Sequence, residues 1–225
     1  MTAAARVPWV VGVSGASGTP YAAAVLRGLL AAALPVDLVV SRAARLTLLD
    51  ETGIAWHDDA ESLRAFLAVR LDADAELDTA TEFDAGQHAV LDDVRFWSAA
   101  DLAAGPSSGS YQTRGMVVVP ASTEAVSGIA IGLSKDLLQR AADVTLKERR
   151  PLVVVPREMP LTAATLRHLV SLAEAGAAVL PASPAFYSKP KNMQQLVDFV
   201  AGKILDALGV AHDLFTRWDG RLGSG

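Results

Sequence analysis

Two cations stand on one face of a predicted helix in the 225-residue chain. Arg140 and Lys147 are seven positions apart, so after two helical turns their side chains point the same way. Asp143 lies four positions before Lys147, at the spacing where opposite charges on a helix meet. The pattern indicates either a binding face for an anion such as phosphate or a solvent-exposed helix whose charges pair with one another.

A strand and an Arg–Glu pair follow that helix. Pro151 ends the helix, and the apolar run Leu152–Val155 is typical of a parallel strand buried on both faces. Arg157 and Glu158 leave this strand at its carboxyl end, where open α/β sheets place their ligands. We therefore expect the helix cations and the Arg157–Glu158 pair to converge on one anionic ligand.

A glycine-rich turn near the start of the chain is a second candidate anion site. Ser14–Gly18 follows a predicted strand over Val7–Val13 and precedes a predicted helix over Tyr21–Ala33. Free N–H groups and the positive end of the helix dipole favour phosphate at such a turn. The turn lacks the Gly-Lys-Ser/Thr of a P-loop and the GxGxxG fingerprint, so a turn without a ligand is the alternative.

Hydroxyl side chains follow two more predicted strands. The strand Val36–Val40 ends at Ser41, and the strand Gly115–Pro120 ends shortly before Ser122 and Thr123. Each hydroxyl either caps the helix that follows or contacts a ligand.

Glu51 and a small-residue loop have no obvious structural role. Glu51 lies near the carboxyl end of a predicted helix, where cations are favoured, so it is either a functional acid or an ordinary surface residue. The loop Ala104–Ser110 is either mobile or covers a site. His57 and His88 are isolated in the sequence, so we expect no metal site.

Strands alternate with helices along the whole chain, which predicts a parallel sheet with helices on both faces. The expected fold is a Rossmann-like (flavodoxin-like) three-layer α/β/α sandwich, formed as one domain over residues 1–225. The tail, about residues 209–225, is too apolar for a free terminus, and we expect it to pack on a neighbouring subunit.

Composition excludes several classes of protein. A content of 51% hydrophobic and 20% charged residues excludes a disordered chain, and a net charge of −5 argues against nucleic-acid binding. The chain contains no cysteine, which removes disulfides and cysteine nucleophiles and is compatible with a reducing cytoplasm. No run approaches the roughly 18 apolar residues of a membrane span.

The motifs in combination resemble the UbiX family of flavin prenyltransferases. The similarity covers almost the whole chain, and the block Arg140–Glu158 is its most specific part. The segments that carry it are Val13–Gly18, Asp50–Thr52, Ser122–Thr123, Arg140–Asp143, Leu146–Val153, Val155–Glu158, Phe186–Tyr187 and Arg217–Trp218.

The resemblance implies an activity and an assembly. Members bind FMN at subunit interfaces of a large homo-oligomer, often a dodecamer. They join a dimethylallyl group from dimethylallyl phosphate to N5 and C6 of reduced FMN without a metal. The product, prenylated FMN, is the cofactor of UbiD-type decarboxylases.

The resemblance also assigns residues. FMN-binding positions are Gly15, Ala16, Ser17, Ser41, Ser122, Thr123, Glu124, Ala125 and Arg157. Prenyl phosphate would be held at Tyr187 and Lys203. The active-site positions are Glu51, Arg140, Lys147, Glu158, Tyr187 and Trp218.

Physical reasoning supports these roles. Fixed cations at Arg140, Lys147 and Lys203 would ease departure of the phosphate, and the Trp218 ring would stabilise an allylic cation. Glu51 is a candidate for handling flavin protons, as is Glu158.

The chain departs from the family pattern at four positions. Lys203 stands where the family usually has Arg, and Ala121 where it often has Cys. Glu124 and Ala125 replace smaller or hydroxyl-bearing residues near the flavin phosphate. Substrate preference and FMN affinity depend on these positions.

Two other functions remain open. One is a flavin-dependent cysteine decarboxylase of the phosphopantothenoylcysteine type, although this chain lacks the flap cysteine and the early histidine known in those enzymes. The other is an FMN carrier without catalysis, suggested by Lys203, Glu124 and Ala125.

Overall fold

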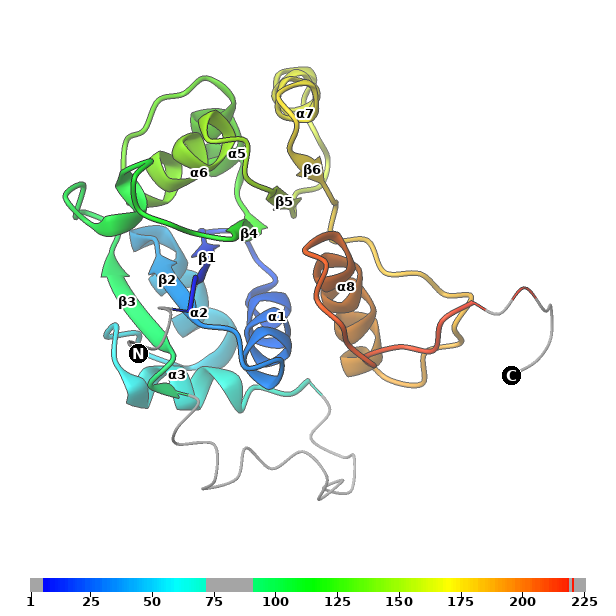
Figure 1. Ribbon diagram of the computed structural model, residues 1–225. Coiled ribbons are helices and arrows are strands. Elements are labelled where there is room, and N and C mark those ends of the chain that lie inside the picture. The colour runs from blue at the N-terminus through cyan, green and yellow to red at the C-terminus, as the bar shows by residue number, and fades with distance from the viewer. Residues whose placement is uncertain (1–5, 72–90, 219, 221–225) are drawn as a thin grey trace.

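A six-stranded, entirely parallel sheet forms the centre of the computed structural model, which describes residues 6–71, 91–218 and 220 (Figure 1). The spatial order β3-β2-β1-β4-β5-β6 is the Rossmann order, in which the chain changes direction between β1 and β4. The strands are β1 (Trp9–Val13), β2 (Val36–Val40), β3 (Val94–Ser98), β4 (Gly115–Ala121), β5 (Leu152–Pro156) and β6 (Ala178–Val179).

Helices cover both faces of the sheet (Figure 1). Along β1, Val11 and Val13 join a buried cluster with α1, α3 and α8, whereas Val10 joins a second cluster with α5, α6 and α7. Side chains that alternate between two apolar layers explain why every residue of β1 is buried. The three-layer prediction is therefore confirmed. The helices are α1 (Thr19–Ala31), α2 (Arg42–Thr52), α3 (Ala60–Leu67), α5 (Thr123–Ala130), α6 (Leu137–Lys147), α7 (Ala163–Glu174) and α8 (Met193–Ala207), with a short 3-10 helix η3 (Gly105–Ser107).

Several predicted boundaries move by a few residues. The first strand begins at Trp9, because Pro8 precedes it, and α1 begins at Thr19, so that Pro20 occupies its first turn.

The described part of the tail packs on α8 of its own chain. The Phe215 ring lies 5.0 Å from the Phe199 ring, and Arg217 donates to Asp206 at 2.8 Å. Packing of the tail on a neighbouring subunit stays a prediction. Within the described residues, no helix combines the length and apolar character that a bilayer crossing requires.

Ser14 joins the two central strands where the chain changes direction. Its buried hydroxyl donates to the Pro120 carbonyl at 2.8 Å and accepts from the Ser122 N–H at 2.7 Å. This link holds the carboxyl ends of β1 and β4 together, and every candidate ligand-binding turn at that edge depends on their spacing.

Replacing Ser14 should destabilise the fold at this link. Ser14→Ala leaves the Ser122 N–H without its acceptor, which we expect to lower the free energy of unfolding by about 1–3 kcal/mol. Urea denaturation measures the change. Ser171→Ala, at an exposed position on α7, is the control and should stay within about 0.5 kcal/mol of the parent. Equal stabilities of the two variants would contradict a structural role for Ser14.

Candidate active site

Three hydroxyl residues meet at the carboxyl edge of the sheet, the edge where all six strands end. Ser14, Ser41 and Ser122 line a narrow crevice of about 10 Å³, together with Glu124 and Ala125. Ser41 caps α2 and Ser122 caps α5, each by accepting a backbone N–H three residues later. The predicted caps are confirmed. The N-terminus of α5 therefore faces a small polar crevice at the switch point, which the Glu124 and Asp136 carboxylates also line. Its N–H groups make it a candidate position for a ligand phosphate.

Arg157 provides an unsatisfied cation at the same edge. Its backbone N–H donates to the Ala121 carbonyl at 3.3 Å, which ties the end of β5 to the end of β4. Its Nε is fully buried and has no hydrogen-bond partner among the described residues. A buried guanidinium nitrogen without an acceptor is costly, so the arrangement fits an anionic ligand such as FMN.

Glu158 is exposed next to Arg157, at the turn that follows β5. Its carboxylate accepts the Met159 N–H at 2.9 Å. An exposed carboxylate at a strand end is accessible to a ligand, as the sequence predicted.

Glu51 occupies the turn that the sequence assigned to phosphate. Its carboxylate accepts the Gly18 N–H at 2.9 Å, the Thr19 N–H at 2.9 Å and the Thr19 hydroxyl at 2.7 Å. The acid near the end of α2 is therefore compensated by the positive end of α1. The simple expectation is that the N–H groups of this turn are free to bind a phosphate. The N–H groups of Gly18 and Thr19 are not free, because they donate to the Glu51 carboxylate.

The surroundings of Glu51 favour its ionised form. Burial raises the pKa of the carboxyl, but hydrogen bonds from the Ser17 and Thr19 side chains and from the Thr19 and Gly18 N–H groups outweigh burial. The net result is a pKa below the ordinary glutamate value. Ser17 and Glu51 thus belong to one network beside the crevice.

Lys147 lies at the amino edge of the sheet, the edge where the strands begin. It is the last residue of α6, and β5 begins only five residues later, whereas Glu158 follows the end of β5. A five-residue strand spans roughly 17 Å. The prediction that Lys147 and the Arg157–Glu158 pair converge is therefore wrong within one chain.

The charges on α6 also pair differently from the prediction. Arg140 donates to Asp143 at 2.8 Å, and its Nε donates to the Ser107 carbonyl at 3.1 Å. Lys147 pairs with Glu148 at 2.7 Å rather than with Asp143. Glu148 lies beyond the last helical residue, so its side chain turns back to the ammonium in a way that helical spacing does not describe.

The residues expected to hold the prenyl phosphate gather around α8. The half-exposed Tyr187 ring contacts the Phe199 ring edge-on at 5.8 Å and the Trp218 ring at 6.3 Å. Lys203 lies 3.7 Å from Asp206, which also binds Arg217. Tyr187 and Trp218 thus lie in contact, and Lys203 is already engaged by a carboxylate; their role in binding the prenyl phosphate stays a prediction.

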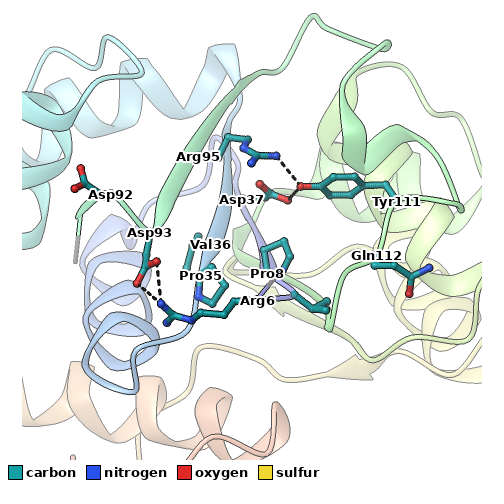
Figure 2. A pocket seen from close by; sticks show the side chains of 11 residues that line it. Arg6, Pro8, Pro35, Val36, Asp37, Asp92, Asp93, Arg95, Tyr111 and Gln112 are labelled. Atoms are coloured by element: carbon teal, nitrogen blue, oxygen red, sulfur yellow. Dashed lines mark hydrogen bonds and ion pairs between the residues drawn. The ribbon is translucent and has the colours of Figure 1, made fainter. Parts of the chain in front are cut away.

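A cavity of about 530 Å³ lies at the amino edge and is a different place from the predicted site (Figure 2). Arg6, Asp37, Arg95 and Tyr111 are among its lining residues, and none of the predicted flavin or prenyl-phosphate positions lines it. No group of three or more His, Cys, Asp or Glu side chains in the described ranges is arranged to hold a metal ion. His88 lies outside those ranges.

Comparison with known proteins identifies the class. The flavoprotein family model matches residues 2–205, which agrees with the Rossmann sheet and its polar carboxyl edge. The flavin prenyltransferase UbiX of Streptomyces coelicolor is 65% identical over 219 residues, or 96% of this chain and 97% of that protein. The UbiX of Pseudomonas aeruginosa is 38% identical over 92% of this chain and 91% of its own length. This chain belongs to the UbiX flavin prenyltransferase family.

Solved structures agree with this membership. AnUbiX (PadA1) in complex with FMN and dimethylallyl pyrophosphate is 33% identical, with a TM-score of 0.79, and covers 96% of this chain and 100% of its own. A dodecameric FMN-dependent UbiX-like decarboxylase from Escherichia coli O157:H7 is 34% identical, with a TM-score of 0.77 over 95% of this chain. A PPC decarboxylase is only 19% identical, with a TM-score of 0.52, and shares the fold alone.

The Glu51 network should stabilise the fold in a pH-dependent way. A pKa lower in the folded than in the unfolded chain gives stability that is present above the unfolded-state pKa and is lost as pH falls through the folded-state pKa. We expect Glu51→Gln to lower the free energy of unfolding by about 1 kcal/mol near neutral pH, and the difference to shrink in acid.

Denaturation at several pH values measures this difference. Glu174→Gln, at an exposed position at the end of α7, is the control and should follow the parent at every pH. A Glu51→Gln effect that stays constant down to acid pH would show that the carboxylate is not held ionised by this network.

Proposed function

We propose that this protein is a flavin prenyltransferase that makes prenylated FMN from reduced FMN and dimethylallyl phosphate. The observation that carries the proposal is the combination of UbiX membership with the buried, unsatisfied Nε of Arg157 at a hydroxyl-lined carboxyl edge. In the reaction the C–O bond to phosphate breaks as the freed carbon bonds to flavin N5, which loses its proton. The double bond of the dimethylallyl group then takes up a proton and bonds to flavin C6, which loses its own proton, so that phosphate is the only group released. The flavin is a substrate, and so is the prenyl phosphate.

The flavin is proposed to bind at the carboxyl edge. The α5 N-terminus, with Ser122 and Thr123, supplies N–H donors for its phosphate, and Arg157, with its buried Nε, supplies positive charge. Gly15, Ala16, Ser17, Ser41 and Ala125 complete the predicted flavin-binding set. Glu124 opposes the phosphate electrostatically, but Lys135 lies 2.6 Å from its carboxylate and neutralises it.

The prenyl phosphate is proposed to lie between subunits. Glu51 and Glu158 stand at the carboxyl edge, and Lys147 of the same chain stands at the opposite edge. Lys147 therefore acts on the flavin site of a neighbouring subunit, and Arg140, on the same helix, is proposed to act there with it. Tyr187, Lys203 and Trp218, which gather around α8, complete the proposed prenyl-phosphate site. Support comes from the UbiX-like relative of Escherichia coli O157:H7, which has a similar fold and is a dodecamer.

Fixed cations are the proposed source of catalysis. Positive charge at Arg140 and Lys147 stabilises the phosphate as it leaves, and the Trp218 ring stabilises the allylic cation that forms. Glu51 is the candidate for moving a flavin proton, because it is held ionised beside Ser17. We propose further that the product serves a UbiD-type decarboxylase and that the protein works in the cytoplasm.

A carrier without catalysis is the second candidate. The Lys203–Asp206 pair favours it, because a lysine already bound to a carboxylate holds phosphate less firmly than a free guanidinium. A carrier would bind FMN and leave it unchanged.

Anaerobic incubation with reduced FMN and dimethylallyl phosphate separates the two candidates. We expect a flavin heavier by one C5 unit, detected by mass spectrometry over many turnovers. If FMN stays unmodified after long incubation with dimethylallyl monophosphate and with the diphosphate, the transferase proposal is contradicted. The second candidate, an FMN carrier without catalysis, would then be favoured.

Mixed oligomers test whether the site is shared between subunits. Lys147→Ala and Glu158→Gln should each reduce turnover by roughly 10²-fold or more while leaving FMN bound. If the two residues act from different chains, random mixing of the variants gives oligomers in which about one quarter of all sites contain both native residues.

A second mixture provides the control for this experiment. Lys147→Ala mixed with Arg140→Ala should stay inactive, because both residues come from the same neighbouring chain. No recovery in the Lys147→Ala and Glu158→Gln mixture would show that these two residues act within one chain.

A further inference from the structure

The small-residue loop at the amino edge is fixed on several sides. Arg150 donates to the Gly109 carbonyl at 2.7 Å, to the Tyr111 carbonyl at 2.8 Å and to the Thr113 hydroxyl at 3.1 Å. A guanidinium that serves three acceptors at once acts as a rigid clamp. The alternative of a mobile loop, left open by the sequence, therefore does not fit this structure.

Tyr111 anchors the same loop to the sheet (Figure 2). Its hydroxyl donates to Asp37 at 2.9 Å and accepts from Arg95 at 3.1 Å, while the Trp97 indole donates to the other Asp37 oxygen at 2.9 Å. Asp37, the second residue of β2, is 1% exposed. A buried carboxylate with both oxygens bonded fixes the ring, and the loop is held at this end too.

These anchors bring Gly109 against the charged end of α6. A side-chain carbon at Gly109 would lie 2.1 Å from Glu148 Oε1 and 2.8 Å from Lys147 Nζ. The Nζ–Oε1 ion pair, at 2.7 Å, therefore fits only against a glycine. At the other end of the loop, the Arg140 Nε donates to the Ser107 carbonyl, so the loop contacts both catalytic candidates of α6.

We infer that the loop of residues 105–111 positions the Lys147 ammonium for prenyl transfer, with Gly109 and Glu148 as positioning residues. The inference rests on the proposed role of Lys147 in binding the prenyl phosphate. Lysine has a flexible four-carbon stem, and an exposed ion pair alone restrains it weakly. The clamped backbone at Gly109 and the Glu148 carboxylate lie together against the ammonium, and this contact restricts its position and preorganises the charge.

Gly109→Ala tests the inference with little expected effect on folding. The atoms that the new methyl group displaces are the free ends of two flexible side chains, so we expect an unchanged melting temperature and unchanged FMN affinity. Turnover with saturating dimethylallyl phosphate should fall roughly 10- to 100-fold, since a displacement of about 1 Å has effects on this scale. Ser171→Ala, at an exposed position on α7 outside the loop, is the control and should turn over like the parent.

A double-mutant cycle shows whether Gly109 acts through Lys147. In a Lys147→Ala background, Gly109→Ala should cause no further loss of single-turnover rate, because the group that it displaces is absent. The same fold-loss in both backgrounds would overturn the inference, and so would parental turnover of Gly109→Ala. Absence of prenyl transfer by the parent protein would instead contradict the proposed function, before any variant is compared.

Discussion

The parallel sheet imposes the constraint on which the rest of this protein depends. All strands end at one edge, so the candidate ligand-binding turns after β1, β2, β4 and β5 meet there. Parallel strand pairing alone is enough to bring these turns together. The same geometry requires α6 to run back along the sheet, and its last residue, Lys147, lies at the opposite edge. A chain of this topology cannot bring Lys147 to its own Arg157, and oligomerisation is the simple way to complete the site.

Charge is distributed so that each edge is stable before a ligand arrives. At the carboxyl edge, Glu51 satisfies the free N–H groups of α1, and Arg157 keeps a buried nitrogen without an acceptor. At the amino edge, Lys147 is held by Glu148 and by the clamped loop at Gly109. The carboxyl edge thus leaves a guanidinium nitrogen without an acceptor, and the amino edge presents an ammonium; both are groups that bind phosphate.

Much of this could be predicted from local sequence. Strand ends, caps at Ser41 and Ser122, and the end of α2 at Gly53 follow from patterns a few residues long, and they are confirmed. Contacts between distant segments are not encoded in such patterns. The bond from Glu51 to Thr19 joins two helices, and the side-chain bond from Tyr111 to Asp37 spans 74 positions. Family resemblance assigned roles to Arg140 and Lys147, but helical spacing alone suggested an Asp143–Lys147 pair that the structure replaces with Lys147–Glu148.

The most direct test of the account is a structure of the oligomer with FMN and a dimethylallyl phosphate bound. The measurement is the distance from the prenyl phosphate oxygens to each nearby Lys147 Nζ. The account predicts that a neighbouring subunit's Lys147 lies within about 4 Å, at ion-pair distance, while the chain whose Arg157 binds the flavin keeps its own Lys147 at the far edge of the sheet. A phosphate bound by Lys147 and Arg157 of one and the same chain would contradict it.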